Sequence, residues 1–288
     1  MKTLLLIDAS ALIYRFFHAL PPLTTPDHKP IQGIYGLANV LLKILREQKP
    51  DYASAALDRP EKTFREEQFK EYKIHRPPAP DALSSQLQAM PELFQVFDIK
   101  TFEKAGFEAD DIIGTLAQKF LEVPDLKIVI LSGDLDILQL VKDEKIVGQI
   151  IKTGVANTEI YNEAKVIERY GLTPAELPDY KALVGDASDN IPGIKGIGPK
   201  SALELLKEFK NLENIFEDLP IINLKIAKKL EGKKEEAFMY RKLATIKKDV
   251  PIAVPDLEEL RIIEPLKDKL AEYFTRLGFV SLIKRLAA

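Results

Sequence analysis

Acidic residues stand at points where the fold could gather them into one site. Asp8, Asp58 and the pair Asp134/Asp136 each directly follow a short apolar run. Because ligand chemistry in an open parallel sheet collects outside the carboxyl ends of its strands, we expect these side chains to lie close together. Two further acidic motifs, Glu108-Ala109-Asp110-Asp111 and a turn at 185–190, complete the set. The sequence predicts one site of nine carboxylates: Asp8, Asp58, Glu108, Asp110, Asp111, Asp134, Asp136, Asp186 and Asp189.

The chemistry that suits so many carboxylates is binding of divalent metal ions. Without cations the carboxylates would repel one another severely. Mg²⁺ or Mn²⁺ solves this problem, because hard cations prefer carboxylate and water oxygens and need no histidine or cysteine. An all-carboxylate set of this size is typical of two-metal phosphodiester hydrolysis. Each carboxylate alone could instead cap a helix, complement a helix dipole or shape a turn. Caps, however, do not need to recur at the ends of several strands.

The composition excludes several other classes of protein and site. The chain of 288 residues has no cysteine, which excludes disulfides, thiolate metal sites and a cysteine nucleophile. Its three histidines, His18, His28 and His75, are too few for a histidine-rich metal site. No run approaches the ~20 apolar residues of a membrane span, and Asp8 ends the first apolar run too early for a signal peptide. We expect a globular cytoplasmic protein with no membrane association.

The alternation of short apolar runs with longer amphipathic ones predicts a parallel sheet flanked by helices. The expected strands are 3–8, 52–58, 127–132 and 146–151, and the first helices are expected from Ala9 and over about 31–47. Between 60 and 97 the chain is charged and helical, and the prolines of 76–80 break it into two pieces. After Tyr161 only helical periodicity remains. We therefore predict an α/β core over 1–165 with an excursion at about 60–97, and a helical region over 166–288.

The charge distribution indicates a polyanionic partner. The formal net charge is −3, but setting the nine carboxylates apart leaves 35 of the 44 acidic residues against 41 basic ones. Residues 225–248 alone contain eight lysines and one arginine, against three glutamates. A basic body beside an acidic metal site suits nucleic acid. The alternative for 225–248 is an ordinary solvated helix face.

The glycine-rich stretch 190–202 predicts a grip on a phosphate backbone. It nearly matches a P-loop, but Pro199 stands where the lysine should be. It nearly matches a dinucleotide fingerprint too, but no strand precedes it and Ser201 replaces the last glycine. We expect a tight hairpin turn between two helices, with the second helix beginning near Pro199. Exposed N–H groups and two lysines could then hold phosphates without reading bases. The alternative is a plain helix connection. The candidate DNA-binding residues of this turn are Gly193, Lys195, Gly196, Gly198 and Lys200.

Several motifs, in this order along the chain, resemble those of the 5′-nuclease family, which includes the 5′→3′ exonuclease domain of bacterial DNA polymerase I and free-standing flap endonucleases. They are Leu6-Ile7-Asp8, Tyr72-Lys73-Ile74-His75-Arg76, Gly106-Phe107-Glu108-Ala109-Asp110-Asp111, Ser132-Gly133-Asp134-Leu135-Asp136, Gly185-Asp186-Ala187-Ser188-Asp189-Asn190 and the glycine-rich turn. The resemblance covers essentially the whole chain.

The resemblance implies a PIN-like nuclease core, a helical arch over the site and a helix–turn–helix-type element that holds duplex DNA. It further implies that the nine carboxylates hold two or more Mg²⁺ or Mn²⁺ ions, with K⁺ at the glycine-rich turn. Lys73 and Arg76, on the arch helix, match a basic pair that contacts the scissile phosphate. Tyr72 matches an aromatic residue that stacks on a displaced base, and Tyr14 and Arg15 lie where relatives approach the DNA. For the tyrosines the alternative is a position in the core, and for Lys73 a solvated surface.

The sequence departs from the family pattern at Ala9, Glu66 and Leu135, where relatives often have glycine, histidine and lysine. None of these changes removes a candidate metal ligand.

The function that the resemblance implies is a structure-specific 5′ nuclease for DNA flaps, nicks and 5′ ends and for RNA primers, active in replication and repair. We expect a monomer that works in the same pathway as a DNA polymerase, either free-standing or as part of one. Two alternatives stay open: a non-enzymatic DNA junction-binding module and a metal-dependent ribonuclease.

Overall fold

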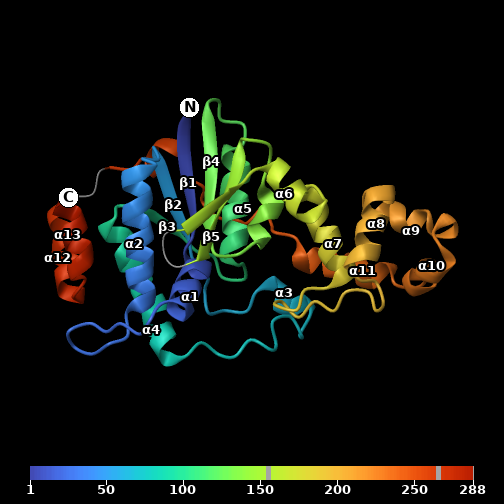
Figure 1. Ribbon diagram of the computed structural model, residues 1–288, viewed down its shortest axis with the longest axis horizontal. Helices are drawn as coiled ribbons and strands as arrows, with labels where there is room; N and C mark the ends of the chain where they lie inside the picture. Colours follow the sequence, from blue (N-terminus) through green and yellow to red (C-terminus); the bar gives the residue numbers. More distant parts are fainter. Residues whose placement is uncertain (154–156, 264–266, 288) are drawn as a thin grey trace.

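A six-stranded, mostly parallel sheet forms the centre of the protein in the computed structural model, which describes residues 1–153, 157–263 and 267–287 (Figure 1). The strand order is β3-β2-β1-β4-β5-β6, and only β6 runs antiparallel to its neighbour. The strands are β1 (Lys2–Asp8), β2 (Tyr52–Ala56), β3 (Lys100–Phe102), β4 (Leu126–Ser132), β5 (Ile146–Thr153) and β6 (Asn157–Tyr161). The predicted α/β class and the four predicted strands are confirmed.

Helices cover both faces of the sheet and continue beyond it on one side (Figure 1). The α-helices of the described residues are α1 (Ala9–Ala19), α2 (Gln32–Glu47), α3 (Phe64–Gln68), α4 (Asp81–Val96), α5 (Ala109–Phe120), α6 (Glu163–Tyr170), α7 (Leu177–Val184), α8 (Pro199–Phe209), α9 (Leu212–Glu217), α10 (Leu224–Leu230), α11 (Lys234–Ala244), α12 (Lys267–Leu277) and α13 (Val280–Ala287). Short 3₁₀ helices are η1 (Asp136–Leu140), η2 (Pro174–Glu176), η3 (Leu219–Ile221) and η4 (Leu257–Leu260). Within the described ranges, no helix is long and apolar enough to span a bilayer.

The central strand β1 shows how the sheet is buried on both sides. Successive side chains of a strand point to opposite faces, so Leu4 and Leu6 join one hydrophobic cluster and Leu5 and Ile7 join the other. The first cluster extends under α5 and on into the helices α7, α8, α9 and α11. The second lies under α1, α2 and α4. A strand that is apolar at every position is the pattern expected of a buried parallel sheet.

Helices of the predicted helical region 166–288 lie at both ends of the molecule. Helices α8, α9 and α10 form a lobe at one end of the molecule, whereas α12 and α13 lie at the opposite end (Figure 1). There Leu270, Phe274 and Leu282 pack in the same hydrophobic cluster as α2 and α4. The last helices are thus part of the covering of the sheet, and the predicted division at 165/166 stays a prediction.

The segment predicted as a helical arch is helical only in part, which corrects the placement of its basic pair on a helix. Only α3 and α4 form within 60–97, and residues 69–80 between them make turns and irregular chain. Lys73 has a positive φ of 53°, which an α-helix does not accommodate. Lys73 and Arg76 therefore lie in a turn and not on an arch helix. The predicted break at the proline cluster is confirmed, because α4 begins directly after Pro80.

Candidate metal centre and nuclease site

The carboxyl end of β1 places Asp8 at the middle of the sheet edge. Its Oδ1 accepts a hydrogen bond from the N–H of Ala11 (3.0 Å), so Asp8 also caps α1. Its Oδ2 accepts from the hydroxyl of Ser132 at the end of β4 (2.6 Å). Burial raises the pKa of Asp8 to about 7, and the charges of Asp58 and Asp134 add to the effect. Asp8 is therefore both a cap and a member of the acidic site.

Asp58, just after β2, joins this edge to the start of α5. Its Oδ1 accepts from the N–H of Ala109 (2.7 Å), and its own N–H donates to the hydroxyl of Ser10 (2.8 Å). The positive end of the α5 dipole therefore faces the carboxylates. The charge of Glu108 acts on Asp58 as well, which brings the α5 carboxylates into the same electrostatic cluster.

The first turn of α5 carries three predicted metal ligands with different surroundings. Glu108 Oε1 accepts a hydrogen bond from Lys73 Nζ (2.7 Å). Asp110 Oδ1 is buried and has no hydrogen-bond partner among the described residues. Burial raises the pKa of Asp110 well above its usual value, because the charged form loses its hydration. An unpartnered carboxylate oxygen of this kind is suited to a cation.

Asp111 differs from the other carboxylates and corrects the prediction made for it. Both of its oxygens accept hydrogen bonds from the guanidinium of Arg65, each at 2.7 Å, and Oδ1 also accepts from the N–H of Lys247 (2.8 Å). Asp111 and Arg65 are almost completely buried. Because these partners satisfy both oxygens, the structure gives Asp111 a structural role in place of the predicted metal-binding one.

Three aspartates form the tightest acidic group of the described residues. One carboxylate oxygen from each of Asp136, Asp186 and Asp189 lies within 4.8 Å of the others. Burial raises the pKa of Asp136 to about 7, although Lys181 opposes the shift. Burial also acts on Asp186, but its contacts with Lys181 prevail and lower its pKa to about 2. Asp134 is exposed beside this group, and its Oδ1 accepts from the N–H of Asp136 (3.0 Å).

The turn at 70–76 brings basic side chains against the acidic groups. Arg76 donates to Asp189 Oδ1 (2.8 Å), and the backbone N–H of Lys73 donates to the carbonyl of Asp189 (2.9 Å). The predicted stacking role of Tyr72 is wrong for this arrangement, because its side chain is only 3% exposed. Its hydroxyl donates to Asp189 Oδ2 (2.9 Å). Tyr72 therefore positions an acidic side chain and has no free face for a base.

Tyr14 and Arg15 lie on α1, two turns beyond Asp8. Tyr14 is 41% exposed, and the charges of Asp58, Arg76 and Lys73 act on its hydroxyl, so it faces the same edge. This exposure excludes the alternative that the Tyr14 side chain lies in the core. The guanidinium of Arg15 donates to the carbonyl of Lys152 on β5.

The structure adds residues that sequence reasoning missed. Lys181 on α7 contacts both Asp136 and Asp186, the latter at 2.6 Å. The only signal in the sequence is a lysine five residues before Asp186. The role of Arg65 could not be predicted from the sequence, because its hydrogen-bond partners, Asp111 and Leu243, lie far from it along the chain.

The glycine-rich turn connects α7 to α8 as predicted, and Pro199 is the first residue of α8. Gly193 is buried with a φ of 68°, and a Cβ there would lie 2.4 Å from the backbone of Gly185. Gly193 therefore serves close packing of two backbone segments and does not face solvent as a DNA contact would. Gly196, Gly198, Lys195 and Lys200 are exposed on the outside of the turn.

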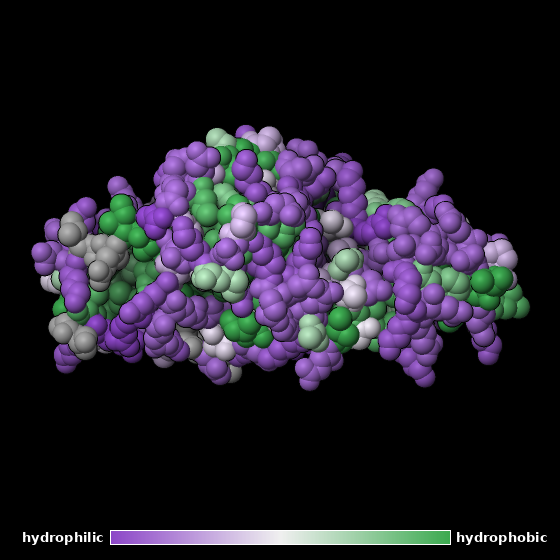
Figure 2. Space-filling model, turned by 90° about the horizontal axis from the view of Figure 1, so that it is seen from above, coloured by the Kyte–Doolittle hydropathy of each residue, from purple (hydrophilic) through white to green (hydrophobic). Residues whose placement is uncertain are grey.

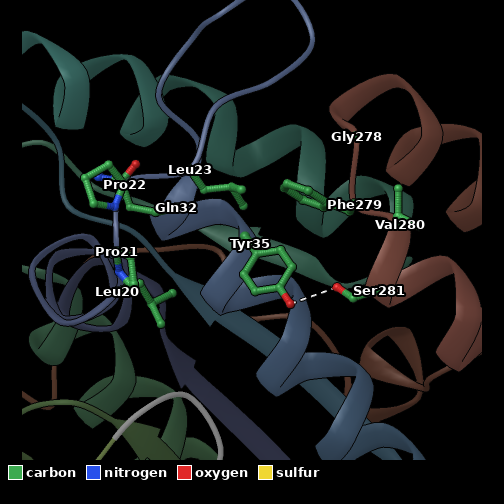
Figure 3. A pocket seen from close by; sticks show the side chains of 10 residues that line it. All are labelled: Leu20, Pro21, Pro22, Leu23, Gln32, Tyr35, Gly278, Phe279, Val280 and Ser281. Atoms are coloured by element: carbon green, nitrogen blue, oxygen red, sulfur yellow. Dashed lines mark hydrogen bonds between the residues drawn. The ribbon is translucent and has the colours of Figure 1, made fainter.

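An apolar cavity of about 390 Å³ lies elsewhere, between the end of α1, the start of α2 and the corner joining α12 to α13 (Figure 3). Tyr35 lines it, and its hydroxyl is hydrogen-bonded to Ser281 (2.9 Å). None of the nine carboxylates lines this cavity. A second cavity, of about 300 Å³, is lined by residues that include Asp136, Lys181 and Asp186 of the acidic site.

The chain matches two family profiles. They are described as the 5′-3′ exonuclease N-terminal resolvase-like domain, over residues 3–171, and the 5′-3′ exonuclease C-terminal SAM fold, over residues 172–268. A 5′-3′ exonuclease of Aquifex aeolicus is 37% identical over 99% of this chain and 95% of its own length. DNA polymerase I of Caldicellulosiruptor bescii is 45% identical over 98% of this chain, but the match spans only 33% of the polymerase.

Solved structures of the bacteriophage T5 enzyme share the fold. One, the 5′-exonuclease with bound zinc, has a TM-score of 0.69 at 24% identity, over 84% of this chain and 89% of the T5 chain. Another, a flap endonuclease in a pseudo-enzyme-product complex with DNA and metal ions, also scores 0.69 at 20% identity over 99% of both chains. The profile matches, which cover residues 3–268, and the 37% identity to the Aquifex exonuclease show that the chain belongs to the 5′–3′ exonuclease family.

Proposed function

We propose that the protein is a structure-specific 5′ nuclease that uses Mg²⁺ or Mn²⁺ to hydrolyse phosphodiester bonds at DNA flaps, nicks and 5′ ends. The observation that carries the proposal is the close group of Asp136, Asp186 and Asp189 at the sheet edge, with Lys73 and Arg76 beside it. Family membership supports the reaction class.

The residues present fit divalent metal ions. The donors are carboxylates, the unpartnered Oδ1 of Asp110 is buried, and carboxylate oxygens of three aspartates lie within one ion's reach. We propose that Asp8, Asp58, Glu108, Asp110, Asp134, Asp136, Asp186 and Asp189 hold two or more ions, some through water. Such ions supply a strong nucleophile at neutral pH and stabilise the charge that develops on the phosphate. The T5 structures contain metal ions, which supports this part of the proposal.

The chain's own basic groups would act on the substrate phosphate. Lys73 Nζ lies 2.7 Å from Glu108, so its ammonium is held at the border of the acidic group. Burial disfavours this charge, but the nearby Glu108 and Asp189 prevail and raise the pKa of Lys73 above its usual value. Lys73 therefore stays protonated at neutral pH. We propose that Lys73 and Arg76 bind the scissile phosphate and stabilise its added negative charge during hydrolysis.

Tyr14, on the exposed side of α1, and Arg15 are proposed to guide the DNA strand near the cut. Exposed Lys195, Gly196, Gly198 and Lys200 are proposed to hold the phosphate backbone of the adjoining duplex. K⁺ at this turn stays a prediction.

The wider context is proposed from the relatives. The chain spans about a third of the length of the DNA polymerase I relatives and nearly all of the Aquifex exonuclease. We propose that it acts as a monomer in the cytoplasm, during replication and repair, on substrates that a DNA polymerase produces. RNA primer ends are included among these substrates.

The test is cleavage of a duplex with a labelled 5′ flap, in Mg²⁺ and in excess EDTA. A short product that maps near the flap junction and forms only with Mg²⁺ is expected. Binding without cleavage in Mg²⁺ and in Mn²⁺ would support the junction-binding alternative. Cleavage of an RNA flap on an all-RNA duplex in preference to the DNA substrate would support the ribonuclease alternative.

A further inference from the structure

Helix α10 and the turn before it carry an unusual combination of side chains on one surface. Residues 219–230, Leu-Pro-Ile-Ile-Asn-Leu-Lys-Ile-Ala-Lys-Lys-Leu, include three lysines and no acidic residue. They form η3 and α10 at the free end of the lobe (Figure 1). We call the exposed part of this segment the α10 surface, which consists of Ile221, Leu224, Lys225, Lys228 and Lys229.

The inner side of the segment anchors it to the large hydrophobic cluster. Ile222 and Leu230 are buried in the large hydrophobic cluster, and Ile226 and Ala227 pack against it. The side chain of Asn223 caps α10 by accepting a hydrogen bond from the N–H of Lys225 (3.0 Å). The segment is thus held mainly by its inward-facing residues, and the outward residues other than Lys229 can serve another purpose.

Two large aliphatic side chains point to solvent in this surface. Ile221 is 74% exposed and Leu224 is 69% exposed. Figure 2 shows hydrophobic side chains among hydrophilic ones at the end of the molecule where α10 lies. Lys228 and Lys229 stand three and four residues after Lys225, so both lie on the same face of the helix as Lys225. An exposed apolar pair bordered by cations is typical of a binding surface.

The α10 surface is continuous with the glycine-rich turn. Lys229 Nζ donates a hydrogen bond to the carbonyl of Gly196 (2.6 Å). A Cβ at Gly196 would lie 3.2 Å from the aliphatic part of the Lys229 side chain, which shows how closely the two segments pack. The exposed Lys195 is the next residue before Gly196 along the turn. A ligand that lies on the turn therefore meets α10 next.

We propose that the α10 surface is a second contact for duplex DNA, in which Lys225 and Lys228 bind phosphates and Ile221 and Leu224 press into the minor groove. The proposal rests on the proposed function and extends it, because it adds a surface beyond the site and the glycine-rich turn. A segment with lysines and no carboxylates is complementary to a polyanion. Apolar side chains that enter the minor groove between flanking cations are a known way to hold and bend a duplex.

The experiment measures the affinity of the whole chain for a labelled nicked duplex by fluorescence anisotropy, with Ca²⁺ in place of Mg²⁺ to prevent cleavage. Wild type, K225Q/K228Q and I221S/L224S are compared between about 50 and 200 mM salt. Each lost phosphate contact lowers the magnitude of the slope of log affinity against log salt by about 1. The slope for K225Q/K228Q should therefore be smaller in magnitude by about 2 than that of wild type. I221S/L224S should weaken binding several-fold and leave the slope unchanged, because it removes no charge.

The matched control is K267Q/K269Q, which removes two exposed lysines from α12 at the opposite end of the molecule. It should behave as wild type. An unchanged affinity and slope for K225Q/K228Q would overturn the proposal, and an unchanged affinity for I221S/L224S would overturn the minor-groove contact. Flap cleavage by the wild type in Mg²⁺ tests the proposed function separately. The DNA contact of the α10 surface can therefore fail while the nuclease function holds, and the reverse.

Discussion

Individual carboxylates of the site differ in role because their partners differ. Asp111 is held on both oxygens by Arg65, whereas Asp110, its neighbour in sequence, has a buried oxygen with no partner. The sequence predicts that both belong to the acidic site, and both lie there. It could not separate the structural residue from the candidate ligand, because Arg65 approaches from a segment more than forty residues away.

Lys73 provides a prediction about the chemical step. Lys73→Ala should lower the single-turnover cleavage rate by roughly 10²–10³-fold, the cost of losing one donor to a developing negative charge. The affinity for the flap substrate should change much less, because many other contacts hold the duplex. Rapid-quench kinetics at saturating enzyme measure the rate. Lys70→Ala, which changes an exposed lysine of the same segment, is the control and should cleave normally. An unchanged rate for Lys73→Ala would contradict its proposed role.

Asp8 provides a prediction about pH. Its pKa is about 7 in the folded chain and about 4 when unfolded, so the folded chain holds the proton more tightly. Stability of the metal-free protein should therefore fall as pH rises between these values, by at most about 1.4 kcal/mol per pH unit from this group. Asp8→Asn removes that loss.

The advantage of Asp8→Asn over wild type in free energy of unfolding should grow from pH 5 to about pH 7 and level off above the folded-state pKa. Urea titrations in EDTA at several pH values measure it. An advantage that is constant with pH would show that the Asp8 carboxylate is not held protonated by burial.

At the scale of elements, the glycine-rich turn depends on one backbone conformation. Gly193 has a positive φ, and a Cβ there would clash with the backbone of Gly185 and Val184 at 2.4 Å. Gly193→Ala should therefore distort the turn and weaken duplex binding, with a loss of stability of roughly 1–3 kcal/mol. Gly198 has a negative φ and no atom within 4 Å of its Cβ position, so Gly198→Ala is the matched control for stability. Equal melting temperatures for the two variants would contradict this explanation.

The elements that the sequence predicts best are those with long apolar runs, such as β1 and β4. The missed strands have no such run. β3 has only three residues, and β6, at the edge, reads Asn-Thr-Glu-Ile-Tyr and is largely polar. The segment around Lys73 was expected to be helical because it is charged and has few turn residues. Its turns are instead held by tertiary contacts, such as the bond from the Lys73 N–H to the Asp189 carbonyl, which local sequence does not report.

At the scale of the whole molecule, a buried ion pair joins distant parts of the chain. Arg65 bonds Asp111 at the start of α5 and also donates to the carbonyls of Leu243 (2.8 Å) and Thr245 (3.0 Å) at the end of α11. Arg65→Met should lower the free energy of unfolding by about 3–5 kcal/mol, because it leaves a buried carboxylate without its partner. Urea denaturation measures the loss.

A comparison with an exposed ion pair makes this prediction specific. Arg59 pairs with Glu61 and Glu103 at the surface, so Arg59→Met should cost at most about 1 kcal/mol. Replacing both Arg65 and Asp111 with apolar residues should recover much of the stability lost in Arg65→Met. A similar small cost for Arg65→Met and Arg59→Met would mean that the buried pair does not join the core to the later helices.

The overall arrangement was only partly predictable. The gathering of carboxylates at one edge follows from the sheet type, which the sequence indicates. The packing of α12 and α13 on the face covered by α2 and α4 could not be predicted, because helical periodicity does not indicate which surface a helix covers.

The central claim is that the carboxylates at the sheet edge carry out metal-dependent cleavage at a 5′ flap. The most direct test compares wild type with Asp134→Ala in Mg²⁺, using one labelled flap duplex for both cleavage and binding. Asp134 is exposed, so its replacement should not disturb the fold, and the exposed Asp249→Ala serves as the control. We predict that Asp134→Ala binds the duplex as wild type does but does not cleave it, whereas Asp249→Ala does both. Cleavage by Asp134→Ala at the wild-type rate would contradict the account.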